Sequence, residues 1–243
     1  MERSAYDRFF ELEQHHFWRR AKRQLVLEWA ENYLPPQPDR RILDIGGACS
    51  LITKELERFG TVVCLEADLA TVELARERLG VDIRQGVFPE VVPEGNFDVI
   101  TMLDVLEHIA DDRKALSGAR QLLKPEGLLM ITVPALRWLW SGHDLALHHY
   151  RRYHRAELVC LLRDTGFRIL RVSYYTSLLL PVLAIQRLLS KLRRRTGTPQ
   201  YDVRVPAKPL NRLFAAVMSA ERCLLRRINL PLGSSLVAAA KPD

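Results

Sequence analysis

The sequence predicts an α/β fold built on a doubly wound, mostly parallel sheet. N-terminal helices precede the sheet, and a helical insertion comes before the last strand. Three observations predict this fold. Short apolar segments alternate with amphipathic segments between residues 41 and 175. The first apolar segment ends in a turn of small residues, 46–50. Residues 176–233 carry helical periodicity.

The elements follow in order along the chain. Apolar positions predict a helix over residues 5–33, ended by the prolines at 35, 36 and 38. The alternation then predicts strands at 41–46, 61–66, 81–85, 97–102, 128–133, 167–175 and 235–240. Helices are expected at 50–59, 70–79, 111–123, 155–164, 177–195 and 209–228.

Charge and composition limit the function classes. The 243 residues suit one α/β domain with an elaboration, and the chain has a formal net charge of +7. Residues 187–227 contain eleven Lys and Arg but two acids, so this segment carries the basic excess. Such a segment indicates an anionic partner surface or a solvated helix face. The N-terminus is too polar for a secretory signal. The four cysteines lack disulfide or zinc spacing, and we expect reduced packing residues in a cytoplasmic protein.

The small-residue turn carries the first functional signal. A strand that stops at small residues and turns into a helix presents backbone amides where nucleotide-like ligands dock. The nicotinamide fingerprint fails after Gly46, because Ala48 and Leu51 stand where its other glycines belong. The turn instead resembles the first motif of class I S-adenosylmethionine-dependent methyltransferases. This resemblance implies a Rossmann-like fold whose mostly parallel sheet has an antiparallel last strand. The resemblance implies that Asp44, Gly46, Gly47 and Ala48 line the cofactor site.

The next strands extend this resemblance. Glu66 ends the second strand, where an acid accepts hydrogen bonds from ribose hydroxyls, and Ala67 follows it. After the third strand, the family often has an acid that meets the adenine amino group. This chain has Val87 and Phe88 there, so the resemblance implies that apolar faces and backbone groups hold the adenine.

The fourth strand resembles the signature of methyltransferases that act on small molecules and quinones. The match runs over residues 97–109 and ends in Leu103-Asp104-Val105-Leu106-Glu107-His108-Ile109. It implies that Leu103 and Asp104 contact the cofactor. His108 follows Asp104 by one helical turn, and we consider it both as a general base and as a capping or core histidine.

Two further segments resemble a bacterial subgroup associated with glycan and lipid-linked sugar pathways. In the first, Trp18 and Arg20 are expected to cap the cofactor, with simple helix packing as the alternative. In the second, His143, Asp144 and His149 follow the fifth strand and border the expected acceptor entrance. Their spacing lacks a recognised ligand pattern, and we predict no metal site.

These observations predict an S-adenosylmethionine-dependent methyltransferase that methylates an oxygen of a small-molecule, sugar or lipid-linked acceptor. Its catalytic candidates are His108, His143, Asp144 and His149. A non-catalytic scaffold with a degenerate cofactor site is the alternative, suggested by Ala48, Ser50 and Val87. A nicotinamide-dependent oxidoreductase ranks last.

The predicted organisation is an N-terminal helical cap (1–40), a cofactor-binding core (41–175 and 234–243) and a helical insertion (176–233). The insertion is expected to serve as a lid, a homodimer contact or a contact with an anionic membrane surface. We do not expect a nucleic-acid partner, because the fourth strand lacks the Asn/Asp-Pro-Pro-aromatic signature that amino-methylating nucleic-acid enzymes resemble. The expected location is the cytoplasm, including the inner face of the membrane.

Overall fold

The structure is a computed structural model that describes residues 3–35, 37, 39–192 and 204–243. The strands are β1 (Arg41–Ile45), β2 (Thr61–Glu66), β3 (Asp82–Gln85), β4 (Phe97–Leu103), β5 (Leu123–Pro134), β6 (Phe167–Tyr175) and β7 (Ser235–Pro242). The α-helices are α1 (Arg3–His15), α2 (Phe17–Tyr33), α3 (Leu51–Glu55), α4 (Leu69–Leu79), α5 (Asp112–Leu122), α6 (Gly142–Ala146), α7 (Arg155–Asp164), α8 (Leu180–Leu192) and α9 (Lys208–Leu225).

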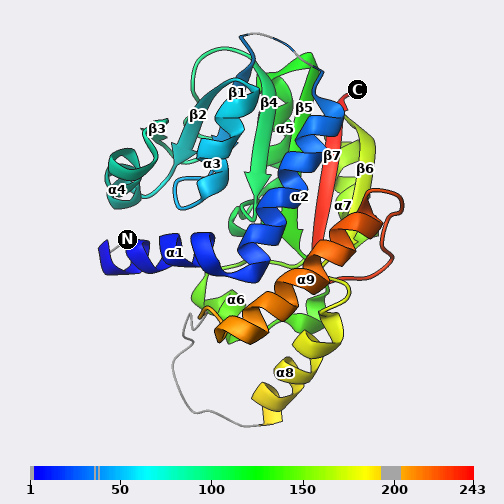
Figure 1. The fold of residues 1–243 in the computed structure, drawn as a ribbon. Coiled ribbons are helices and arrows are strands. Elements are labelled where there is room, and N and C mark those ends of the chain that lie inside the picture. The colour runs from blue at the N-terminus through cyan, green and yellow to red at the C-terminus, as the bar shows by residue number, and fades with distance from the viewer. Residues whose placement is uncertain (1–2, 36, 38, 193–203) are drawn as a thin grey trace.

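The strands form one mixed sheet in the order β3-β2-β1-β4-β5-β7-β6 (Figure 1). The pairs among β1 to β5 are parallel, whereas β7 runs antiparallel to both β5 and β6. This arrangement confirms the predicted fold class. The chain order reverses between β1 and β4, and ligands of open α/β sheets bind beside the carboxyl ends of strands at such a point.

The core strands are buried over most of their length, because helices cover both faces of the sheet. The burial pattern of β1 shows one exposed residue followed by four buried ones, and the central part of β5 is buried throughout. Such continuous apolar runs are typical of parallel strands that are covered on both faces.

The N-terminal segment differs from the predicted single helix over residues 5–33. His16 interrupts it and is the N-cap of α2, since its Nδ1 accepts a hydrogen bond from the Trp18 amide at 3.3 Å. Figure 1 shows α1 lying below the carboxyl ends of β1 to β3, while α2 crosses in front of β4 and β5. The break therefore directs two helices to two different parts of the sheet.

The insertion contains α8 and α9, and α9 packs along α2 (Figure 1). Helix α8 begins at Leu180 rather than at the predicted 177, and the end of the predicted helix at 193–195 lies outside the described residues. Glu221 of α9 explains the later start. Its buried carboxylate accepts hydrogen bonds from the amides of Thr176, Ser177 and Leu178 at 2.5, 2.7 and 2.8 Å. None of the described helices combines the length and apolar character needed to cross a bilayer.

The cysteines fit the packing prediction only in part. Cys64 is buried in β2 and Cys49 is half-buried, but Cys160 and Cys223 are exposed. The prediction of packing residues was wrong for these last two, because they lie on the outer faces of α7 and α9. All four thiols are free.

Candidate active site

The turn after β1 is built around the carboxylate of Asp44, which is fully buried. The hydroxyl oxygens of Thr53 and Thr101 each lie 2.6 Å from this carboxylate. Burial raises the pKa of Asp44, whereas these two hydroxyls oppose the rise. A Cβ at Gly47 would lie 1.9 Å from an Asp44 oxygen, and Gly46 has a φ of 71°. The two glycines are therefore required by contact and by backbone conformation.

Helix α1 covers this turn. The Tyr6 hydroxyl donates to the Ala48 carbonyl at 3.2 Å, and both residues are fully buried. The Ser50 hydroxyl donates to Glu13 at 3.0 Å, and Arg19 pairs with the same carboxylate at 2.9 Å. Burial raises the pKa of Tyr6 to about 12, so its hydroxyl stays a donor at neutral pH. The sequence showed Ala48 and Ser50 as small residues in a loop, but it did not show that α1 contacts both.

Glu66 lies at the carboxyl end of β2, beside the turn, because β2 pairs with β1. Its Oε1 accepts hydrogen bonds from the amides of Ala67 and Asp68 at 3.0 and 3.2 Å. Among the described residues, both bonds go to Oε1, which leaves Oε2 available for a ligand. Burial raises the pKa of this carboxyl, and the two amides oppose the rise. Asp68 caps α4 by accepting from the Thr71 amide at 2.9 Å.

Val87 and Phe88 follow β3, and the structure places them differently. The Val87 side chain is exposed, whereas Phe88 is only 6% exposed and belongs to the hydrophobic core. The ring of Phe88 points toward Gly118 of α5. Val87 is therefore the more accessible of the two to an adenine.

Asp104 follows β4 and its neighbour Leu103, and it has a φ of 58°. Its carboxylate accepts from the Thr132 hydroxyl and from the Lys22 ammonium, each at 2.9 Å. Burial opposes ionisation of Asp104, but Lys22 outweighs burial and lowers its pKa. Lys22 belongs to α2 and is 5% exposed. Lys22 was not among the residues predicted to contact the cofactor, although it follows two residues of α2 that were.

Those two residues are Trp18 and Arg20. The Trp18 indole nitrogen donates to the Thr176 hydroxyl at 2.9 Å, and its ring stacks on Tyr175 at the end of β6. Arg20 is exposed on α2. Their assignment to the cofactor stays a prediction.

Asp144 organises the segment after β5. It is fully buried in α6, where it forms a capping box with Ser141. Arg152 binds both of its oxygens at 2.7 and 3.1 Å, and His149 Nδ1 lies 3.2 Å from Oδ1. Burial opposes ionisation, but the bonds from His149 and Arg152 outweigh it and lower the pKa of Asp144. Such a carboxylate positions its neighbours and has no exposed oxygen for an acceptor.

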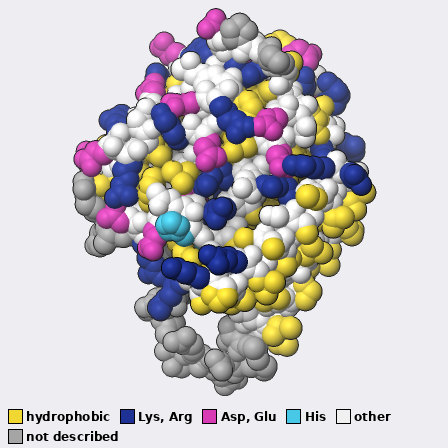
Figure 2. All heavy atoms as spheres, in the orientation of Figure 1, with side chains coloured by type: hydrophobic (Ala, Val, Ile, Leu, Met, Phe, Trp, Pro, Cys, Tyr) yellow, Lys and Arg dark blue, Asp and Glu magenta, His cyan; other side chains and the backbone are white. Residues whose placement is uncertain are grey.

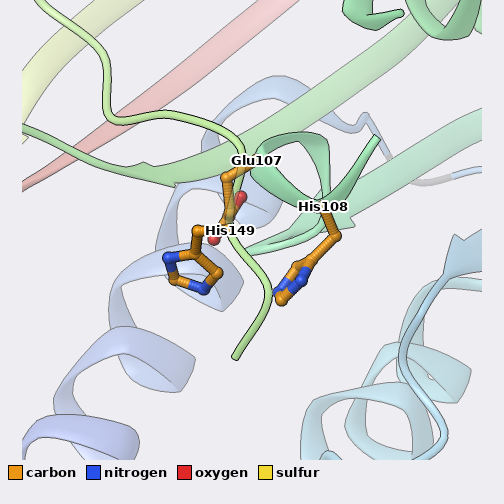
Figure 3. Close-up of side chains that lie close together, drawn as sticks. All are labelled: Glu107, His108 and His149. Atoms are coloured by element: carbon orange, nitrogen blue, oxygen red, sulfur yellow. The ribbon is translucent and has the colours of Figure 1, made fainter. Parts of the chain in front are cut away.

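His108 and His149 come from distant segments, yet their ring centroids are 4.6 Å apart in an edge-to-face contact. Figure 3 shows both rings beside the Glu107 carboxyl. Glu107 and His108 lie in the short 3₁₀ helix that follows Asp104. Glu107 is 1% exposed, and burial together with Asp104 raises its pKa well above the usual range. Both histidines were predicted as catalytic candidates from the sequence, but the buried acid beside them was not.

His143, the remaining catalytic candidate, lies in α6. Burial and the nearby Arg187 of α8 lower its pKa to about 4, so its imidazole is neutral at physiological pH. It therefore lies at the junction between α6 and the insertion.

Comparison with known proteins identifies the family of this chain. Residues 14–172, well over half of the chain, match a family described as "Methyltransferase domain". The chain belongs to this methyltransferase family. Its family and its fold are those of class I S-adenosylmethionine-dependent methyltransferases.

Curated relatives and solved structures agree with the family. The chain is 32% identical over 121 residues to a ubiquinone biosynthesis O-methyltransferase of Bartonella tribocorum, covering 47% of this chain and 48% of the relative. It is 34% identical over 112 residues to a probable S-adenosylmethionine-dependent methyltransferase of Mycolicibacterium smegmatis, covering 44% of each. These matches span about half the length of either relative. A Thermotoga maritima methyltransferase, described as a possible histamine N-methyltransferase, has the same fold with a TM-score of 0.62 at 18% identity, covering 99% and 95% of the two chains.

The residues of the small-residue turn (46–50) fit S-adenosylmethionine. Gly46 and Gly47 leave the backbone at the end of β1 without side chains. Gly47 lies directly against the Asp44 carboxylate, where there is no room for a Cβ. One strand away, Glu66 offers Oε2 for ribose hydroxyls. The amides of a turn that leads into a helix favour negatively charged groups such as the cofactor carboxylate. The cofactor supplies a methyl group that is already activated on a sulfonium.

Proposed function

We propose that this methyltransferase methylates an oxygen atom of a small-molecule, sugar or lipid-linked acceptor. The observation that carries the proposal is the pair of imidazoles, His108 and His149, beside Asp104 at the carboxyl end of β4. An imidazole next to an acceptor hydroxyl serves as a general base, and such a base contributes about 10²–10⁴-fold to the rate. Two of the relatives support an oxygen acceptor, because their names describe O-methyltransferases.

In this proposal the chain's residues divide the work between two sites. The cofactor site is formed by residues at the ends of β1 to β4 and by two residues of α2: Asp44, Gly46, Gly47, Ala48, Glu66, Ala67, Val87, Phe88, Leu103, Asp104, Trp18 and Arg20. His108 and His149 contact the acceptor, while Asp144 holds His149 and His143 borders the insertion. Alignment of acceptor and methyl carbon for in-line displacement supplies about 7–11 kcal/mol of the barrier reduction.

The proposal divides the chain into a cap (1–40), a core (41–175 and 234–243) and an insertion (176–233). The contacts of Tyr6 and Glu13 with the turn support the cap. The buried Glu221, which binds three amides at the entrance to the insertion, supports its role as a defined unit.

The acceptor is tested by incubating the enzyme with isotope-labelled S-adenosylmethionine and three acceptor classes: a hydroquinone, a free sugar and a polyprenyl-linked sugar. Transfer of one labelled methyl group to an oxygen, located by mass spectrometry, is expected for at least one class. His108→Ala and His149→Ala should each lower single-turnover transfer by at least tenfold. Transfer to nitrogen or carbon only, or rates within threefold of wild type in both variants, would contradict the proposal.

We further propose that the insertion places the enzyme on an anionic membrane at the inner face of the cell membrane. An apolar face of α8, α9 and adjoining residues is exposed (Figure 2). It consists of Leu178, Val182, Ile185, Leu188, Leu210, Leu213, Leu224, Ile228 and Leu232, each 43–60% exposed. Exposed basic residues of α9 and its end, including Lys208, Arg212 and Arg227, accompany it. Apolar side chains with neighbouring Lys and Arg suit an anionic lipid surface.

Vesicle sedimentation tests this placement. Wild type should bind vesicles rich in phosphatidylglycerol more tightly than neutral vesicles. Ile185→Asp and Leu213→Asp should weaken binding, whereas Val92→Asp, an exposed apolar position outside the face, should not. If wild type ignores vesicles and the two variants instead dissociate a dimer, the face is a subunit contact and the membrane proposal is wrong.

A further inference from the structure

We propose that Glu107, His108 and His149 bind a divalent transition-metal ion, with Zn²⁺ and Mn²⁺ as the representative ions. One ligand atom of each residue lies within 4.8 Å of the others. The three side chains converge from the 3₁₀ helix after β4 and from the segment after α6 (Figure 3). The site joins residues far apart in the sequence, which is why the 143–149 spacing alone did not predict it.

Glu107 is the first independent observation that points to a ligand. Its side chain is 1% exposed, and neither carboxyl oxygen has a hydrogen-bond partner among the residues that the structure describes. A buried carboxyl without a partner is costly, and proteins retain such groups where a ligand or ion completes them. A cation between Glu107 and the two imidazoles would supply the missing partner.

The orientation of His149 is the second observation. Its Nδ1 faces Asp144 Oδ1 at 3.2 Å, which leaves Nε2 for an ion. Asp144 is itself fixed by two contacts to Arg152, at 2.7 and 3.1 Å. A carboxylate that holds the second ring nitrogen of a histidine is the usual support of a metal-bound imidazole, since it fixes the tautomer and the ring direction.

The distances between the three ligand atoms are somewhat longer than in a metal-bound site, and a small movement of the side chains would bring them into range. Ligand atoms around a tetrahedral ion with bonds of about 2.1 Å lie about 3.4 Å apart. His108 is the exposed member of the three, so rotation of its side chain can close the remaining gap. Glu107 and His149 are buried and half-buried, and they provide the fixed part of the site.

The donor set selects the class of ion. Imidazole nitrogens suit zinc, copper, iron and nickel, and the Glu107 carboxylate also suits manganese, whereas Mg²⁺ and Ca²⁺ prefer sites made of oxygen. Three protein ligands from one side leave open positions for water or a substrate oxygen, as in catalytic rather than structural metal sites.

This inference rests on the proposed function for its role but not for its binding. A coordinated acceptor hydroxyl becomes more acidic and releases its proton to solvent water. Its oxygen then forms a bond to the methyl carbon while the carbon–sulfur bond breaks, and the sulfonium becomes a neutral thioether. In the metal-bound enzyme His108 and His149 are therefore ligands, and the ion takes over the activation of the acceptor hydroxyl that the proposed function assigns to these imidazoles as general bases.

The test measures metal binding without cofactor or acceptor. The full-length protein is stripped with a chelator, dialysed against Zn²⁺, Mn²⁺ or Mg²⁺, and analysed for bound metal per chain. One Zn²⁺ or Mn²⁺ per chain is expected, with Mg²⁺ bound at least tenfold more weakly. Glu107→Gln, His108→Ala and His149→Ala should each weaken Zn²⁺ binding by about 10–100-fold. His148→Asn is the matched control, because His148 is an exposed neighbour with a φ of 56° that asparagine tolerates.

Co²⁺ substitution supplies a second readout. The protein with bound Co²⁺ should show visible d–d absorption that disappears in the three variants and remains in His148→Asn. Circular dichroism verifies that each variant is folded. Absence of stoichiometric metal in wild type, or binding that the three variants leave unchanged, would overturn the inference. Binding of S-adenosylmethionine by the metal-free protein would then still stand, so this failure is distinct from failure of the proposed function.

Discussion

The Lys22 ammonium donates a hydrogen bond to Asp104 across 2.9 Å, which joins helix α2 to the carboxyl end of β4. The pair is largely buried, with side-chain exposures of 6% and 24%. In the proposed function this pair lies between the cofactor side and the acceptor side, because Asp104 precedes the segment with Glu107 and His108 by one short turn. The helix that supplies Lys22 thus helps to fix the geometry of both sides.

Replacing Lys22 by methionine removes this cation from a buried carboxylate. We expect Lys22→Met to lower the unfolding free energy by about 1–3 kcal/mol at pH 7, because Asp104 keeps Thr132 but loses its charge partner. The pKa of folded Asp104 lies below its unfolded value, so the pair stabilises above about pH 4 and its effect is lost as pH falls. Urea unfolding of wild type and variant should show a gap that narrows in acid, and a gap that is constant with pH would contradict this.

Gly47 has no room for a side chain. An alanine Cβ would lie 1.9 Å from Asp44 Oδ2, so we expect Gly47→Ala to displace the carboxylate and destabilise the protein by at least 2 kcal/mol. Gly80→Ala is the comparison, since its Cβ meets nothing within 4 Å and its cost of about 1–2 kcal/mol comes from a φ of 62°. Thermal and urea unfolding measure both. If both variants lost the same unfolding free energy, the turn at Gly47 would be able to accommodate a Cβ, which would contradict this prediction.

The Tyr6 hydroxyl ties α1 to the turn at Ala48. We expect Tyr6→Phe to lower stability by about 1 kcal/mol and to speed release of S-adenosylhomocysteine by roughly fivefold, because α1 covers the turn. Stopped-flow displacement measures the release rate. Tyr33→Phe in α2 is the control, and it should change neither quantity. Unchanged release in Tyr6→Phe would mean that α1 does not retain the product.

Asp144 holds Arg152 and His149, so its charge supports two buried side chains. We expect Asp144→Asn to cost about 3 kcal/mol of stability and to lower kcat while the KM for S-adenosylmethionine stays within twofold. Because unfolding of part of the enzyme would lower the apparent kcat without changing KM, kcat is calculated per folded chain, with the folded fraction measured by circular dichroism at the assay temperature. Asp164→Asn breaks an exposed pair with Arg113 and should stay within about 0.5 kcal/mol of wild type.

The strands and helices of the sheet region could be predicted because apolar periodicity and turn residues in the nearby sequence mark where each element begins and ends. Helix α7 and strand β6 have the predicted bounds, since apolar periodicity and the glycine between them mark both ends. The break at His16 could not be predicted in the same way. Both halves of that segment have helical periodicity, and only the contacts of α1 with the turn favour two helices.

The site could be predicted only where it follows strand ends. Glu66 and Asp104 fall at the carboxyl ends of β2 and β4, the two strands that flank β1, as sequence position indicates. The choice between Arg20 and Lys22 depends on the rotation of α2 about its axis, and the structure buries Lys22. Glu107 was not selected because an acid in the sequence gives no sign that it will be buried without a partner.

Isothermal titration calorimetry with S-adenosylmethionine and S-adenosylhomocysteine tests the central claim most directly. Wild type should bind each at one site, and Glu66→Ala should weaken binding by about 10–100-fold, as expected for loss of charged hydrogen bonds to the ribose. Asp82→Ala, which changes an exposed acid of β3, should bind like wild type. No heat with either compound, or binding that Glu66→Ala leaves intact, would contradict a cofactor held at the carboxyl ends of β1 and β2.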